Sequence, residues 1–235
     1  MTNYYKAVRP DGSSFFDPKF KWIPKRGTIP AEGIEVKHQT STQVRQTAAS
    51  YLSASTAPTD CTGMEWPCRL LRIEHITGTP LPVVPSYIIL PNKVASTSWR
   101  VVEELPANQV FGSNGEAVVE FLEYITKATS KELDVLLRYT PIPVDQLFRI
   151  NQNHDAARQA LPNYIWNISL PSNRPSIRSA AITLGTVIMF KDFLPAEVSR
   201  NYLSIWESIK AGVCPQCRMK DQHKLGCSEI WKDQL

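Results

Sequence analysis

Four residues near the end of the sequence have the types and the spacing of a zinc site. Cys214, Cys217, His223 and Cys227 follow the pattern Cys-x2-Cys-x5-His-x3-Cys. A Cys-x2-Cys pair on a tight turn can place two thiolates on one metal ion, and the second half supplies a nitrogen and a third sulfur. These ligands complete a tetrahedral site and leave no position where a bound water is activated. The sequence therefore predicts one structural zinc ion that stabilises a tail poor in apolar residues.

The order of these ligands resembles the zinc knuckles of retroviral nucleocapsids, which follow Cys-x2-Cys-x4-His-x4-Cys. Here His223 stands one position later, and the aromatic and basic residues with which knuckles hold nucleobases are sparse. The resemblance implies a nucleic-acid-binding protein that acts through the zinc tail. The departures weigh against this hypothesis, which we keep as an alternative.

A second set of residues is ordered as in an enzyme family. Arg9 follows the first expected strand, Ser53 and Ser55 lie on a middle strand, and Glu103 lies near the end of the last strand. The order resembles the Arg…Ser-x-Ser…Glu layout of ADP-ribosyltransferases. The resemblance implies an arginine that anchors a phosphate of a nicotinamide cofactor, serines that shape the nicotinamide pocket, and a glutamate that polarises the ribose. In that family one residue separates two acids, whereas Glu104 directly follows Glu103 here.

Two further cysteines are not placed for metal binding. Cys61 and Cys68 flank the segment Thr-Gly-Met-Glu-Trp-Pro, and this separation is wide for a metal-binding turn. We expect both to be packed or semi-exposed thiols rather than metal ligands. The five cysteines are an odd number, which suits metal ligands and unpaired thiols in a reducing compartment rather than a disulfide framework.

The composition is that of a soluble globular protein with a modest positive charge. The 235 residues are 43% hydrophobic and 20% charged, and the formal net charge is +4. This charge is low for a dedicated nucleic-acid coat protein. No apolar run reaches the roughly 18–20 residues that span a bilayer, and residues 1–10 lack the apolar segment of a signal peptide. We therefore expect a cytoplasmic protein without a membrane partner.

The first part of the chain has the pattern of short strands broken by proline and glycine. Alternating apolar residues predict strands at Tyr4–Val8, Ile34–His38, Tyr51–Ser55, Arg69–Ile76, Tyr87–Leu90 and Thr97–Leu105. Arg9–Gly12 is a strong turn signal after the first strand. A short helix is possible at Thr42–Ala49, and the prolines from Pro80 to Pro91 favour a long ordered loop.

The period of the apolar residues changes to that of helices near Ser113. Asn114 and Ser130 are expected to cap two helices, Val144–Leu161 has the pattern of a third, and Pro175 and Pro195 open two more, the last of which ends at Gly212. The helix from Pro175 is apolar on most sides and should be the central one. The predicted fold class is α+β, with a β-rich domain at 1–110, a helical region at 111–211 and a small zinc clip at 212–235.

Three segments of the N-terminal part resemble uncharacterised proteins of actinobacteria and their bacteriophages. They are YKAVRPDGSSF, YLSASTAPTDCTGMEWPCRL and RVVEELP. The resemblance implies a phage-encoded or actinobacterial protein, which in the phage case acts in the host cytoplasm. It implies no activity.

The sequence favours binding over catalysis. It contains no nucleophile elbow, no phosphate-cradling loop and no dinucleotide fingerprint. Trp22 and Trp66 lie in expected loops, where aromatic residues can anchor an interface. The leading hypothesis is a non-enzymatic accessory protein that binds a host or phage macromolecule, in the first place a protein. The ADP-ribosyltransferase-like enzyme and the nucleic-acid-binding protein are the alternatives.

Overall fold

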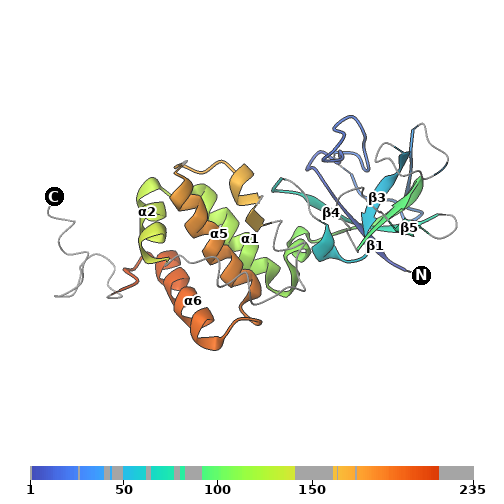
Figure 1. Ribbon diagram of the computed structural model, residues 1–235. Helices are drawn as coiled ribbons and strands as arrows, with labels where there is room; N and C mark the ends of the chain where they lie inside the picture. Colours follow the sequence, from blue (N-terminus) through green and yellow to red (C-terminus); the bar gives the residue numbers. More distant parts are fainter. Residues whose placement is uncertain are drawn as a thin grey trace. The chain divides into compact units, whose positions relative to one another are not determined.

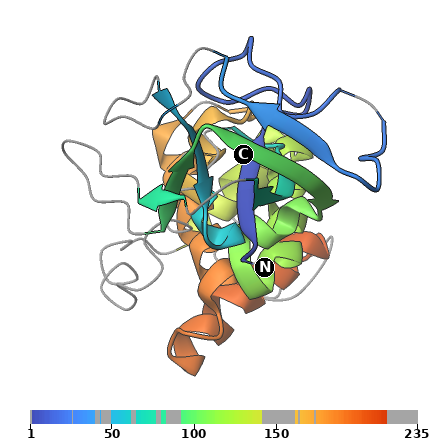
Figure 2. The same ribbon diagram turned by 90° about the vertical axis from the view of Figure 1, so that its right-hand side faces the viewer.

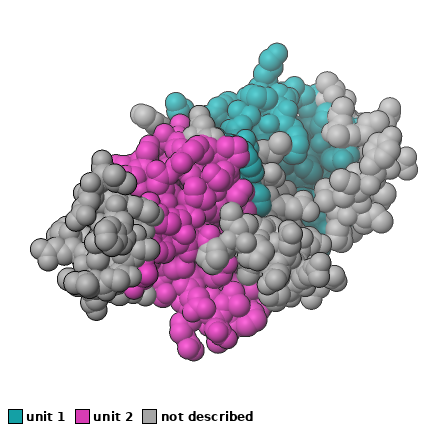
Figure 3. Space-filling model, turned by 60° about the vertical axis from the view of Figure 1, so that its left-hand side comes forward, with its two compact units in different colours: residues 1–116, 154–167 teal, residues 117–153, 168–235 magenta. Residues whose placement is uncertain are grey.

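The computed structural model describes residues 2–25, 27–39, 43, 50–61, 65–76, 80–82, 92–140, 161–162, 164–172 and 174–216. The chain forms two compact units, and Figure 3 shows them in different colours. Unit 1 consists of residues 1–116 and 154–167, and unit 2 consists of residues 117–153 and 168–235. The predicted boundary at residue 110 stands six residues before the division after Glu116. Most of the predicted clip at 212–235 lies outside the described residues.

Unit 1 contains a seven-stranded sheet in which every neighbouring pair is antiparallel. The strand order is β2-β7-β4-β1-β3-β6-β5, so β1 lies in the middle of the sheet (Figure 2). The strands are β1 (Tyr4–Val8), β2 (Ile34–Lys37), β3 (Leu52–Ser55), β4 (Arg69–His75), β5 (Leu81–Pro82), β6 (Lys93–Ser96) and β7 (Ser98–Leu105). Together with the helices below, they confirm the α+β class.

Five of the expected strands are confirmed, each to within one residue at either end; they are β1, β2, β3, β4 and β7. The strand expected at Tyr87–Leu90 and, apart from Gln43, the helix expected at Thr42–Ala49 lie outside the described residues. β5 and β6 were not expected. β5 lies inside the proline-rich segment that was expected to be loop throughout.

One core of unit 1 forms where the long β1–β2 connection packs on the sheet. Trp22 and Ile23 from this connection pack with Val8, Leu71 and the central residues of β7. Trp22 is only 2% exposed. The interface role considered for Trp22 is therefore wrong, because its ring is part of the core.

A second cluster of unit 1 includes Phe111 of the 3-10 helix η3 (Ala107–Asn114), which contacts the 3-10 helix η2 (Pro58–Asp60). The ring centroids of Trp66, Phe111 and Tyr164 lie 5.2–5.9 Å from one another in tilted and edge contacts. Such contacts add to the stabilisation from burial. Trp66 therefore also packs within unit 1, although it keeps some exposure.

Unit 2 is helical, and its described helices are α1 (Gly115–Lys127), α2 (Ser130–Tyr139), α5 (Pro175–Phe190) and α6 (Ala196–Lys210) (Figure 1). α5 is buried from Ala180 to Phe190, which confirms that it is the central helix. It packs against α2 and α6, while Trp206 of α6 holds Phe121 and Tyr124 of α1 in edge contacts. The expected helix at Val144–Leu161 lies outside the described residues except for Leu161.

The helix ends follow the sequence signals, with shifts of one residue at the starts of α2 and α6, where Pro195 precedes the first helical residue. Pro175 occupies the first turn of α5 as expected. The cap of α2 is Thr129, not Ser130, because Thr129 and Glu132 form a reciprocal capping box. α6 ends in a Schellman motif in which the N–H of Gly212 donates to Ile209 and that of Val213 donates to Ser208. Among the described helices, none has the length and apolarity to cross a membrane.

Candidate functional site

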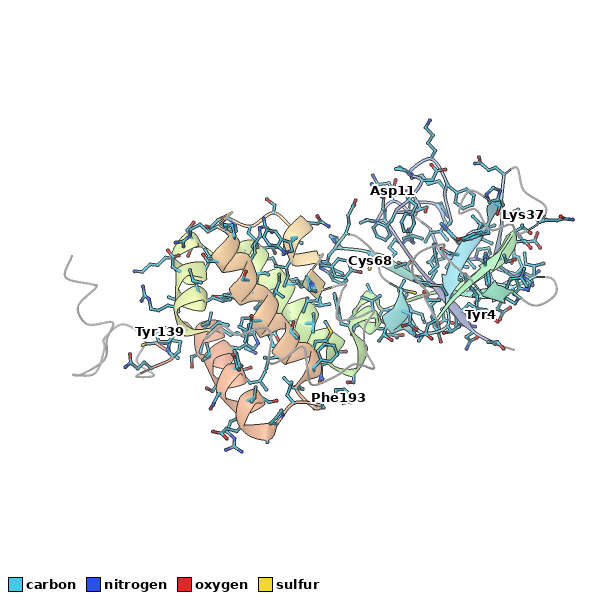
Figure 4. The ribbon with its side chains drawn as sticks, in the orientation of Figure 1. Tyr4, Asp11, Lys37, Cys68, Tyr139 and Phe193 are labelled. Carbon is cyan, nitrogen blue, oxygen red and sulfur yellow. The ribbon has the colours of Figure 1, made fainter. Side chains whose placement is uncertain are left out.

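Of the four predicted zinc ligands, the structure describes Cys214. The Schellman motif at Gly212 fixes the backbone two residues before it. The thiol is buried, and its sulfur lies 3.7 Å from the hydroxyl of Tyr139 in α2 (Figure 4). Cys217, His223 and Cys227 lie outside the described residues. Within the described ranges there is no group of three or more potential metal ligands, and with three of the four predicted ligands undescribed, the zinc site stays a prediction.

Arg9 and Glu103 each pair with a different oppositely charged residue. The Arg9 guanidinium lies 3.0 Å from the carboxylate of Glu65. The carboxylate of Glu103 accepts two hydrogen bonds from Arg72, at 2.6 and 2.9 Å. Each of these groups is therefore held by its own ion pair.

The two serines of β3 accept hydrogen bonds from two lysines. Lys6 of β1 donates from its ammonium to the carbonyl of Ser53 at 2.9 Å and to its hydroxyl at 3.2 Å. Lys93 of β6 donates to the hydroxyl of Ser55 at 2.6 Å. These contacts follow from the strand order, because β3 lies between β1 and β6.

The sheet register does not bring Arg9, the serines and Glu103 together. Glu103 pairs with Arg72, Arg72 with Tyr5, and Tyr5 with Ser55. Glu103 and Ser55 thus stand three strand spacings apart, about 14 Å at the usual separation of neighbouring strands. Arg9 follows the last residue of β1 and lies four positions beyond Tyr5. In the described structure, no common site for a nicotinamide cofactor is assembled from these four residues.

The structure instead brings together a group that the sequence did not single out, the lysine cluster, formed by Lys6 and Lys93 with Ser53 and Ser55. Burial, and next the charge of Lys93, lowers the pKa of Lys6 to about 8, while Cys61 has a smaller opposing effect. Burial also lowers the pKa of Lys93. One signal was present in the sequence. Lys6 stands between Tyr4 and Val8 on the alternating pattern of a strand, where an apolar residue is the usual occupant.

Cys61 lies beside the lysine cluster. Cys61 and Cys68, the latter labelled in Figure 4, are both packed thiols. Both side chains are buried, and neither forms a disulfide. Burial raises the pKa of Cys61, and burial followed by the neighbouring Cys61 raises the pKa of Cys68 to about 12. Of the two expected states, packed or semi-exposed, the structure shows packed thiols. Both are therefore neutral near pH 7.

The base of an exposed loop is fixed next to β1. We call residues 13–21 the Phe16 loop. Ser13 and Lys21 form a β-bridge across its base. Asp11 accepts hydrogen bonds from Lys21 and from Ser13, and these hold the pKa of its carboxyl well below the usual range (Figure 4). The N–H of Trp22 donates to the carbonyl of Gly12 at 2.9 Å, which ties the base to the core.

The tip of the Phe16 loop is also held by hydrogen bonds. The N–H of Phe20 donates to the carbonyl of Asp17 at 3.0 Å and closes a β-turn with Pro18 at its second position, where proline is favoured. The Asp17 carboxylate accepts from the N–H of Lys19. The Ser14 hydroxyl accepts from the N–H of Phe16. The Phe16 side chain is nevertheless 78% exposed.

The chain matches no protein-family model, no curated protein and no solved structure. The Phe16 loop, the lysine cluster and the predicted zinc ligands are therefore the features of the chain that can indicate its function.

Proposed function

We propose that the protein is a non-enzymatic accessory protein that binds a protein partner through the Phe16 loop, with a structural zinc ion ordering its C-terminal end. The observation that carries the proposal is the exposure of Phe16 on a loop whose base and tip are both fixed. The resemblance of the sequence to actinobacterial and phage proteins suggests a host or phage protein as the partner. The host cytoplasm is then the proposed location.

A single exposed apolar residue is common on protein surfaces and needs no functional reason. Phe16 differs because its loop is ordered before any partner binds. Its neighbours Ser14 and Asp17 hold the backbone by local hydrogen bonds. Binding through an ordered loop costs little additional conformational entropy. An aromatic ring presented in this way suits an apolar pocket on a partner.

The residues around Phe16 suit the edge of an interface. Asp17 and Lys19 are exposed, and Lys21 and Asp11 pair at the base of the loop. A typical interface has an apolar centre and a polar rim that stays accessible to water. The Phe16 loop offers both within nine residues, with the aromatic ring at its centre.

The zinc ion in this proposal is structural. Three features would favour it: the two-residue spacing of Cys214 and Cys217, the fixed backbone before Cys214, and the burial of the Cys214 thiol. A ligand held in place before the metal binds lowers the entropy lost on closing the site. Zinc would then fasten the residues after α6, and the partner would bind elsewhere, at the Phe16 loop.

The test compares two exposed phenylalanines. Tagged wild-type protein, Phe16→Ala and Phe193→Ala are expressed in the producing cell, and the bound proteins are quantified by mass spectrometry. Phe193 is 51% exposed and lies between α5 and α6 in unit 2, so it is a matched control (Figure 4). Burial of a phenylalanine is worth about 1.5–3 kcal/mol, so Phe16→Ala should lose about 90% or more of a specific partner while Phe193→Ala retains it. The proposal fails if both variants recover the same proteins in the same amounts.

A further inference from the structure

The lysine cluster holds two ammonium groups beside two serines that lie on one face of strand β3. Ser53 and Ser55 are two residues apart in β3, so their side chains leave the same face of the strand. At the rise of an extended chain they are separated by about 6.6 Å. Lys6 binds the first serine and Lys93 binds the second. The two ammonium groups therefore lie at neighbouring same-face positions of β3, close enough for the charge of Lys93 to lower the pKa of Lys6 after the larger effect of burial.

The positive charge of the cluster exceeds the negative charge around it. Within the described part of the chain, no carboxylate lies within ion-pair distance of either ammonium group. Asp60 raises the pKa of Lys93 through its charge, but the atom that accepts from Lys93 is its backbone carbonyl, at 2.5 Å. Cys61 adds no negative charge, because burial raises the pKa of its thiol. Among the described residues, the cluster thus has two ammonium groups and one nearby carboxylate, that of Asp60.

Other cations of the sheet in unit 1 are paired. Arg69 pairs with Glu104, Arg72 with Glu103, and Arg100 with Glu35. Partly buried charges are costly unless a counter-charge lies nearby. Among these described cations, Lys6 and Lys93 are the ones without a carboxylate at ion-pair distance. A bound anion would supply the missing counter-charge.

The cluster also has hydrogen-bond donors to spare. An ammonium group has three N–H donors. Lys6 uses two of them on Ser53, and Lys93 uses two on Ser55 and the Asp60 carbonyl. The hydroxyl of Ser53 accepts from Lys6 and keeps its own hydrogen for donation. The Ser55 hydroxyl already donates to the Asp60 carbonyl. Within the described part of the chain, three donors have no hydrogen-bond acceptor: one on each lysine and one on Ser53. The ammonium group of Lys6 also lies 5.1 Å from the centroid of the Trp22 ring.

We propose that Lys6 and Lys93 bind a tetrahedral oxyanion of the phosphate type between them, with the Ser53 hydroxyl as a third donor. Charge-assisted hydrogen bonds of about 2.8 Å from the two ammonium groups to different oxygens of one anion would let the anion bridge them. The bound anion supplies the missing negative charge. The site lies wholly within unit 1 and shares no residue with the Phe16 loop, so either proposal can fail without the other.

The first experiment measures the binding of inorganic phosphate by titration calorimetry at pH 7 and constant ionic strength. Lys6→Met and Lys93→Met keep most of the apolar stem and remove one charge each. Each should weaken phosphate binding at least tenfold. Lys37→Met is the matched control, because Lys37 is an exposed lysine of the same sheet that pairs with Glu35 (Figure 4). Equal binding by Lys6→Met and wild type, or absence of phosphate binding by wild type at 10 mM, overturns the site.

The second experiment uses the unaltered protein and so does not depend on the folding of a variant. Lysines are acetylated briefly with acetic anhydride at pH 8, and the modified positions are quantified by peptide mass spectrometry. Phosphate should slow the acetylation of Lys6 and Lys93 at least threefold and leave that of Lys37 unchanged. Equal rates with and without phosphate at all three lysines contradict the proposal.

A third arm distinguishes the source of the anion. Adenosine 5′-monophosphate replaces inorganic phosphate in the calorimetry. Binding of the nucleotide with the same dependence on Lys6 and Lys93 assigns the site to a phosphate monoester. Binding of phosphate without binding of the nucleotide assigns it to the free ion.

Discussion

Arg72 and Glu103 stand directly opposite each other on β4 and β7, and their side chains form an ion pair at 2.6 Å. The contact uses both the Nε and one terminal nitrogen of the guanidinium, which fixes the Glu103 carboxylate against the sheet. Opposite charges at facing positions of antiparallel strands stabilise the pairing of the strands. The same ion pair holds the Glu103 carboxylate at β4, which is two strand spacings from the serines of β3.

Glu103→Ala should therefore have a small effect on stability. Exposed ion pairs contribute about 0–1 kcal/mol, and both partners of this pair keep substantial exposure. Glu104→Ala is the matched comparison, since its partner Arg69 is only 16% exposed and also donates to the carbonyl of Pro24. In urea titrations, we expect Glu104→Ala to lower the free energy of unfolding by more than Glu103→Ala does. A larger loss from Glu103→Ala than from Glu104→Ala would contradict the structural role given to Arg72.

Gly12→Ala should destabilise the protein strongly. Gly12 has a φ of +81°, and a Cβ at this position would lie 2.0 Å from the carbonyl oxygen of Ile23. Gly212 also has a positive φ, of +66°, but a Cβ there meets no atom within 4 Å. The left-handed conformation alone costs a non-glycine residue about 1–2 kcal/mol. Gly212→Ala should lose about this amount in denaturant titrations, and Gly12→Ala should lose clearly more. Equal losses of unfolding free energy in the two variants would contradict this, because the backbone at Ile23 would then move away from the new Cβ without a cost in stability.

Local signals in the sequence determine the elements that could be predicted. β1 is an apolar strand followed by Arg9–Gly12, where the N–H of Gly12 donates to the Arg9 carbonyl at 2.8 Å as in a β-turn. Pro175 and Gly212 mark helix ends because each restricts or permits one backbone conformation. These signals act over a few residues, and the structure follows them closely.

The parts that could not be predicted depend on pairing between distant segments. β6 begins with Lys93 and has four residues, so its sequence lacks a strong strand pattern. It is a strand because β3 pairs with it, which also brings Lys93 beside Ser55. The order β1-β3-β6 cannot be read from local periodicity. For this reason the sequence predicts the strand that carries the serines but not the lysines that bind them.

Cys61 and Cys68 should resist alkylation in the folded protein. Thiolate is the reactive form, and a thiol whose pKa is about 12 is ionised to about one part in ten thousand at pH 8. Treatment with iodoacetamide at pH 8, followed by peptide mass spectrometry, should modify both residues much faster in guanidinium chloride than in native buffer. A similar rate for Cys68 in both conditions would contradict its burial.

Protein purified without a chelator should contain about one zinc ion per chain by elemental analysis. Cys217→Ala should abolish the bound zinc, because the site would lose one of four ligands. Cys61→Ala is the control and should keep the full content, since Cys61 is buried in unit 1 and outside the predicted site. A wild-type sample without zinc would refute the predicted clip.

The stability difference between wild type and Lys6→Met should depend on pH. Burial, and next the charge of Lys93, lowers the pKa of Lys6 from 10.5 to about 8 in the folded protein, while Cys61 has the opposite effect. Between these two pH values the unfolded chain carries a proton on Lys6 that the folded chain has released. The free energy of unfolding of wild type should therefore rise relative to Lys6→Met as the pH increases from 8 to 10.5, by up to about 3 kcal/mol. Below pH 8 the difference should be constant, because Lys6 is protonated in both states.

The measurement is urea unfolding of both proteins at pH 7, 9 and 10.5 in a buffer without phosphate, since a bound anion would raise the pKa of Lys6. Lys37→Met is the control, and its difference from wild type should stay small at all three values because Lys37 is exposed. Titration of Cys68 contributes equally to every variant and cancels in the comparison. If the difference between wild type and Lys6→Met does not change between pH 7 and 10.5, the ammonium group of Lys6 is hydrated, and the charge argument for the lysine cluster loses its basis.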